Sequence, residues 1–157
     1  MNLLRVTALP SVALISIALG GCATESSSPT PDAPGASQPA GSTPVVLELD
    51  GEEIAGVLDG SATAASLISQ LPVTLTVSDY GGQELIGELP EPLSLEGAPD
   101  GSGAAPLTIG YYVPQQSLVL YYTEVGYFGG IVPIGSFEST DAIVGRPGHI
   151  TLIIRAR

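Results

Sequence analysis

The chain holds few side chains that could carry out nucleophilic or metal chemistry. Its 157 residues include one cysteine, Cys22, and one histidine, His149. A Ser/His/Asp triad would have to recruit His149, but no Gly-x-Ser-x-Gly elbow is present to expose a nucleophile. Zinc sites need more His and Cys ligands than this, and the acidic turns at residues 50–53 and 100–103 lack the ligand spacing of a calcium loop. We therefore expect no catalytic residue of these kinds, no metal and no cofactor.

Tyrosines supply most of the aromatic side chains, because Trp is absent and Phe occurs only twice among the 157 residues. Two Tyr-Tyr pairs, at residues 111–112 and 121–122, fall on neighbouring predicted strands, so one ring of each pair should face inward. A tyrosine joins apolar area to a polar tip and suits both a core position and a binding groove, so packing within the fold is the alternative. We expect a ligand groove where this hairpin meets a strand end and a long loop, with Ser78, Asp79, Tyr80, Glu96, Gly97, Pro99, Tyr111, Tyr112 and Tyr122 as its residues.

The first 22 residues, which end at Cys22, resemble a bacterial lipoprotein signal. Residues 1–21 carry one positive charge, Arg5, then an apolar run, and end in Leu-Gly-Gly directly before Cys22. This is the layout of a secretory leader, and its apolar run is too short for a spanning helix. The Leu-Gly-Gly-Cys sequence resembles a lipobox, in which the cysteine is acylated and becomes the first residue of the mature protein. The alternative is an ordinary signal peptide with an incidental cysteine.

Composition divides the remainder into a tether and a folded domain. Residues 22–44 hold Ala, Ser, Thr, Pro, Gly, Gln and two acids after the cysteine, with no Val, Ile, Leu or aromatic residue. Such a stretch buries too little apolar surface to offset the entropy lost on ordering. From Val45 to Arg157 short apolar runs alternate with Gly, Pro and Asp, as in a single domain.

The charge is strongly acidic, with sixteen Asp and Glu against four Arg and no lysine, for a formal net charge of −12. No basic residue lies between Arg5 and Arg146. Nucleic-acid binding and attachment to a membrane through basic residues both need clustered cations, so neither is expected. The lipid on Cys22 would be the membrane contact, and the negative rim at Asp79 and Glu96 favours a neutral or cationic small ligand or peptide.

The elements that must position these residues are mostly short strands. Apolar alternation and turn signals predict about eight strands and one helix, with a second helical turn at residues 138–144. Pro133 predicts an edge or a bulge in its strand. The predicted strands are residues 45–49, 53–58, 73–77, 84–89, 107–113, 117–123, 131–136 and 149–155, with a helix over 61–70 and a long loop over 90–106.

Six sequence segments in order resemble the bacterial cyclophilin-like domain family. They are Leu71–Tyr80 (LPVTLTVSDY), Glu88–Pro90, Leu95–Pro99, Leu107–Pro114, Leu118–Tyr122 and Gly126–Gly135. The resemblance runs from about Leu47 to Arg155. It implies a mainly β fold, a closed eight-stranded cyclophilin-like barrel with a short helix over each open end, and it implies no established reaction.

True cyclophilins isomerise X–Pro bonds with a strand-borne arginine, and the middle of this chain has none. An isomerase would need Arg146 or Arg155 in an unfamiliar place. The sequence therefore favours an exported, lipid-anchored and non-catalytic binding module of the cell envelope. The alternatives are an atypical peptidyl-prolyl isomerase and a structural or protein-interaction module.

Overall fold

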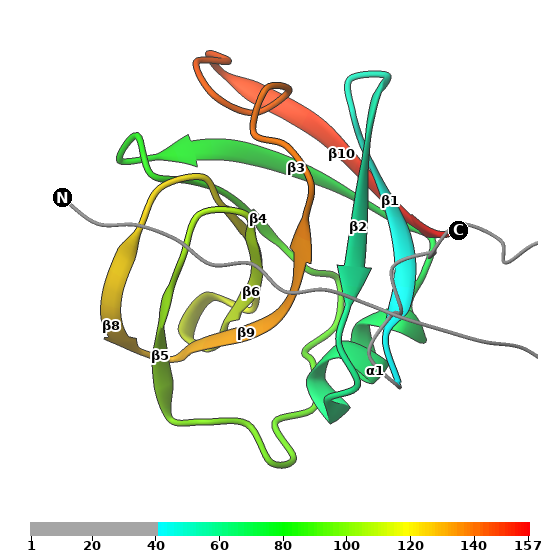
Figure 1. Ribbon diagram of the computed structural model, residues 1–157, viewed down its shortest axis with the longest axis vertical. Helices are drawn as coiled ribbons and strands as arrows, with labels where there is room; N and C mark the ends of the chain where they lie inside the picture. The colour runs from blue at the N-terminus through cyan, green and yellow to red at the C-terminus, as the bar shows by residue number, and fades with distance from the viewer. Residues whose placement is uncertain (1–40) are drawn as a thin grey trace, which may run out of the picture. The chain divides into compact units, whose positions relative to one another are not determined.

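The computed structural model describes residues 41–157, which form an antiparallel β-barrel (Figure 1). Cys22, the predicted signal and nearly all of the predicted tether lie outside the described residues. Ten strands, one α-helix and one 3-10 helix occur in the described range. Their bounds are β1 Thr43–Leu49, β2 Glu52–Leu58, α1 Ala62–Ile68, β3 Val73–Tyr80, β4 Glu84–Glu88, β5 Gly101–Ala104, β6 Thr108–Tyr112, η1 Val113–Gln115, β7 Ser117–Tyr121, β8 Val125–Gly129, β9 Ile131–Phe137 and β10 His149–Ala156.

Eight of these strands close the barrel in the order β1-β10-β3-β4-β7-β6-β9-β2, and β2 pairs back onto β1. The first and last strands of the domain are therefore neighbours, with Leu47 opposite Ile154. The seam between β2 and β9 is short, with three residue pairs from Gly56 opposite Phe137 to Leu58 opposite Gly135. The predicted mainly β fold and closed eight-stranded barrel are confirmed.

The barrel interior is filled by the apolar residues that alternate along the strands. Residues two apart on a strand share a face, so every second side chain of β1, β3 and β10 points inward. A small barrel of eight strands leaves room for these side chains and little else. The inward residues of these three strands are Val45, Leu47, Leu49, Val73, Leu75, Val77, Ile150, Leu152 and Ile154, all 5 % exposed or less.

Helix α1 covers one end of the barrel and begins at a serine cap. The Ser61 hydroxyl accepts a hydrogen bond from the Ala64 N–H at 3.1 Å, which satisfies one of the free donors of the first turn. Ala64 and Leu67 are fully buried in the core. The opposite end lies under the connection between β9 and β10 (Figure 1), where Ile143 is buried. The predicted turn there is a single one, with the Val144 N–H bonded to the Thr140 carbonyl at 3.0 Å, and not a second helix.

The predicted loop over residues 90–106 is partly wrong, because it contains strand β5. This strand pairs with β8, which the sequence patterns did not predict, and the two form a separate ribbon beside the barrel. Both strands are rich in glycine since their backbones lie close together. A Cβ on Gly101 would stand 2.5 Å from the Phe128 carbonyl oxygen, so a bulkier residue there would push the strands apart. Small residues carry little strand signal.

Two local predictions about turns and bulges are confirmed. Asp50 and Gly51 both have positive φ, 49° and 91°, as a tight hairpin turn between β1 and β2 requires. Pro133 lies where the pairing of β6 with β9 shifts, since Gly110 faces Pro133 while Ile109 faces Gly135. No helix within residues 41–157 is long and apolar enough to cross a membrane.

Candidate functional site

The outer wall of the barrel carries a second apolar cluster where the β5–β8 ribbon lies over it. Every residue of β7 is buried, because its inner face joins the barrel core and its outer face is covered. Val119 and Tyr121 point outward, and they pack with Ala104 of β5 and Ile131 of β9. The ribbon therefore converts part of an ordinary barrel exterior into a sheltered surface.

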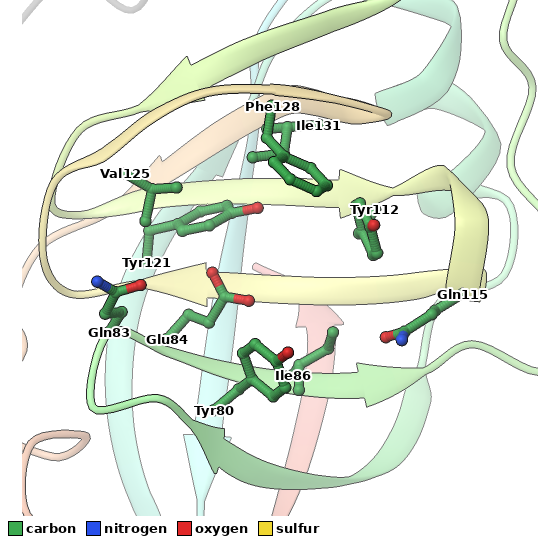
Figure 2. A pocket seen from close by; sticks show the side chains of 10 residues that line it. All are labelled: Tyr80, Gln83, Glu84, Ile86, Tyr112, Gln115, Tyr121, Val125, Phe128 and Ile131. Carbon is green, nitrogen blue, oxygen red and sulfur yellow. The ribbon is translucent and has the colours of Figure 1, made fainter.

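A groove of about 270 Å³ opens beside this cluster, between the wall strands β4, β6 and β7 and strand β8. Figure 2 shows Phe128 reaching from β8 over the wall, and the side chains of Tyr121 and Glu84 below it. Ligand sites are typically concave and mostly apolar, with a few polar groups. The lining residues are Tyr80, Gln83, Glu84, Ile86, Tyr112, Gln115, Tyr121, Val125, Phe128 and Ile131.

Four aromatic rings border this groove. The rings of Tyr112 and Phe128 have centroids 6.1 Å apart and are tilted by 49°. Tyr80 and Phe128 remain 66 % and 57 % exposed, although an apolar ring gains by leaving water. Tyr121 is buried with its ring over Gly110, where a Cβ would stand 2.8 Å from Cε2 of that ring. Gly110 therefore lets the Tyr121 ring lie close to β6 as part of the groove wall.

Among residues 41–157, Glu84 is the one charged residue that lines the groove. It stands opposite Tyr121 across the β4–β7 pairing, and its carboxylate points into the space between Tyr121, Tyr80 and Tyr112 (Figure 2). Burial raises the pKa of Glu84 above its usual value, and the negative charge of Asp79 raises it further. The site thus holds a partly desolvated carboxylate next to aromatic faces.

Asp79 and Tyr122 do not line the groove, and Tyr122 packs against the barrel core. The Tyr122 hydroxyl donates a hydrogen bond to Oδ2 of Asp79. Burial, that hydrogen bond, and the charges of Asp79 and Glu84 raise the pKa of Tyr122 to about 12. Burial also raises the pKa of Tyr121, with further contributions from Glu84 and Tyr112. Because their pKa values are raised, Tyr121 and Tyr122 are neutral near pH 7.

The structure brings together only part of the groove predicted from sequence. Tyr80 and Tyr112 line the observed groove, whereas Asp79 and Tyr122 are hydrogen-bonded to each other and are not among its lining residues. Ser78 lies one pair further along β3, opposite Ile86.

The other predicted groove residues lie elsewhere. Tyr111 faces the barrel core, where its hydroxyl accepts a hydrogen bond from the Leu93 N–H at 3.4 Å. Glu96, Gly97 and Pro99 belong to the connection between β4 and β5, which passes the end of the barrel near α1, whereas β3 ends at the opposite side (Figure 1).

Most residues of the groove lining were not predicted from the sequence. Glu84 and Ile86 alternate on β4, so their shared outward face was readable from the pattern. The positions of Val125 and Phe128 could not be predicted, because both residues reach the groove from strand β8 of the ribbon, which was not predicted. Gln83 and Gln115 lie at turns, where no alternation of apolar and polar residues predicts which way a side chain points.

The arginines in the described part of the chain do not line the groove. Arg146 forms ion pairs with Glu52 and, at 4.0 Å, with Asp50, and Arg155 pairs with Glu53. Both guanidinium groups are thus held at the hairpin between β1 and β2. His149 begins β10 and pairs with Ser78 of β3.

The sequence model of the cyclophilin-like family matches residues 47–155, and the chain belongs to that family. Among solved structures, it is similar to the solution structure of a hypothetical protein from Archaeoglobus fulgidus. The two share 12 % identity with a TM-score of 0.61, over 77 % of this chain and 99 % of the other. At that identity the likeness shows a common fold. No curated protein matches the sequence.

Proposed function

We propose that this protein is an exported, lipid-anchored member of the cyclophilin-like family that binds a small ligand or peptide at the cell envelope without catalysing a reaction. One observation carries the binding part of the proposal. A groove of about 270 Å³ with four aromatic rings and one carboxylate lies on the barrel exterior. The export and anchoring part rests on the leader and on Cys22.

The side chains in the groove support binding over catalysis. Within the part of the chain that the structure describes, Glu84 is the only acid of the lining, and no His, Cys or Lys lines the groove beside it to act as a nucleophile or to exchange protons with it. General acid–base chemistry usually pairs such groups within hydrogen-bond reach. The aromatic rings, by contrast, offer apolar contact area with few rotatable bonds.

The positions of the arginines favour a non-catalytic binding protein over a peptidyl-prolyl isomerase. Polarising a twisted prolyl amide needs a positioned donor or cation. Arg146 and Arg155 instead pair with carboxylates at the β1–β2 hairpin. A proline-isomerisation assay on a Pro-containing peptide should give the uncatalysed rate. A clear acceleration, lost in Arg146→Ala or Arg155→Ala, would overturn the non-catalytic proposal.

The test of binding is native mass spectrometry on the full chain purified from its own host in detergent. Wild type should retain a bound molecule that Phe128→Ala loses, because Phe128 lines the groove. Tyr127→Ala is the matched control, since Tyr127 directly precedes Phe128 in β8, is 74 % exposed and does not line the groove. A molecule lost from Tyr127→Ala alone, or lost equally from both variants, would place recognition on the ribbon surface and favour the interaction-module alternative. Retention by both variants would contradict binding in the groove.

A further inference from the structure

The Glu84 carboxylate has no ion-pair or hydrogen-bond partner within residues 41–157. The ion pairs of this range involve Arg146 and Arg155, which lie at the β1–β2 hairpin. A partly buried carboxylate without a counter-charge is costly, and proteins usually pair such groups. The nearby Asp79 makes the local potential more negative still, and it is bonded to a neutral tyrosine. The groove therefore has room and a field for one positive charge that the described chain does not supply.

The surroundings of Glu84 distinguish between kinds of cation. A metal ion would need several oxygen or nitrogen ligands at short range, and the described residues contain no group of three or more His, Cys, Asp or Glu so placed. A primary ammonium has three donors that all need acceptors once water is removed. Besides Glu84, the groove offers four aromatic rings and the apolar side chains of Ile86, Val125 and Ile131, with two glutamines as its further polar residues. Ring faces attract cations electrostatically, and quaternary ammonium ions need no hydrogen bonds.

We propose that the groove takes a small organic cation with a quaternary ammonium head, its charge against Glu84 and its methyl groups against the rings of Tyr80, Tyr112 and Phe128. This inference rests on the proposed binding function and names the ligand class. The carboxylate sets the sign of the charge, and the rings set the preference for a methylated head. The Tyr112–Phe128 pair, 6.1 Å between centroids, forms one side of this site and Tyr80 the other (Figure 2).

Three probes that share a two-carbon alcohol test the inference by ligand-observed NMR on the full chain in maltoside micelles. Choline has the methylated cation, 3,3-dimethyl-1-butanol is its neutral isostere, and ethanolamine has the charge without the methyl groups. Choline should bind about tenfold tighter than the neutral isostere, which corresponds to about 1.4 kcal/mol, and tighter than ethanolamine. Its affinity should fall with added salt, because a charge pair at a partly open site is screened.

Glu84→Gln keeps the side-chain size and removes the charge, so choline should bind this variant no better than the isostere. Glu88→Gln is the matched control, since Glu88 is on the same strand and face but does not line the groove. It should leave choline binding unchanged. Thermal melts of both variants verify folding.

The possible results distinguish a failure of the assigned ligand class from a failure of the proposed binding function. If the isostere binds as tightly as choline, or Glu84→Gln binds choline normally, the cation assignment is overturned while a binding groove stands. If ethanolamine binds as tightly as choline or more tightly, the preference for a methylated ammonium head is overturned. If no probe binds and Phe128→Ala also loses no molecule in native mass spectrometry, both the inference and the binding function fail.

Discussion

Gly135→Ala should strongly destabilise the barrel, because this residue lies in the short seam that closes it. Gly135 faces Leu58 across the β2–β9 seam and Ile109 of β6 on its other side. A Cβ there would stand 2.2 Å from the Val57 carbonyl oxygen and 3.0 Å from Cα of Leu58. Both contacts are with backbone, so no side chain can rotate away and the two strands must separate.

The cost follows from the displacement and the bonds at risk. Inserting a methyl group into a packed site costs about 1–3 kcal/mol when neighbours can adjust. Opening a three-pair seam also weakens hydrogen bonds worth about 1 kcal/mol each. We expect a loss of about 3–4 kcal/mol, which for a domain of this size lowers Tm by about 10–15 °C.

Thermal and denaturant unfolding followed by far-UV circular dichroism measure the changes in Tm and in the free energy of unfolding. Gly129→Ala is the matched control, because Gly129 is also in a strand and its added Cβ would have no heavy atom within 4 Å. The control should change stability by less than about 0.5 kcal/mol. If Gly135→Ala melts within two degrees of wild type, the close approach of β2 and β9 and the reasoning from it are wrong.

Three further predictions concern the leader, the tether and the titration of the tyrosines. Cys22→Ser should move the protein from the membrane to the soluble or extracellular fraction, since acyl chains are the expected anchor, and unchanged fractionation would refute lipidation. A chain beginning at Thr43 should unfold at the same midpoint as one beginning at Ala23, because the residues between them offer no large apolar side chain to dock. A drop of more than a few degrees would show that they pack on the barrel. The free energy of unfolding should fall as pH rises from about 10 to about 12. The pKa values of Tyr121 and Tyr122 are raised in the folded protein, so both side chains stay protonated there. The unfolded chain loses these protons first, which favours unfolding as pH rises. A flat stability profile over that range in urea titrations would contradict these shifts.

The barrel could be predicted from sequence because its strands must bury one face. Val73, Leu75 and Val77 alternate without interruption, and a slip of one residue would expose all three. The same alternation located the last strand. The Asp50-Gly51 pair located a turn, because the positive φ angles there restrict the residue types.

The groove could be predicted only in part, because it depends on a contact between backbones. Strands β5 and β8 come together through glycines such as Gly101, which leave no periodic apolar pattern. Without the ribbon, Phe128 has no assigned direction and the cover of the groove is missing. The long loop that holds Glu96 was predicted to border the groove, but its sequence does not show which end of the barrel it crosses.

The pairing of β1 with β10 makes the order of synthesis matter for folding. Leu47 meets Ile154, near the other end of the chain, so this pairing has almost the largest sequence separation possible in this domain. Such topologies have high contact order and fold in milliseconds to seconds, because a long loop must close before the contact is gained. Until the last eight-residue strand has emerged, β1 and β3 each present an open edge to solvent. The unfinished chain is therefore exposed to pairing with other chains for as long as its final strand is missing, and it depends on rapid completion or on shielding by other proteins to avoid aggregation.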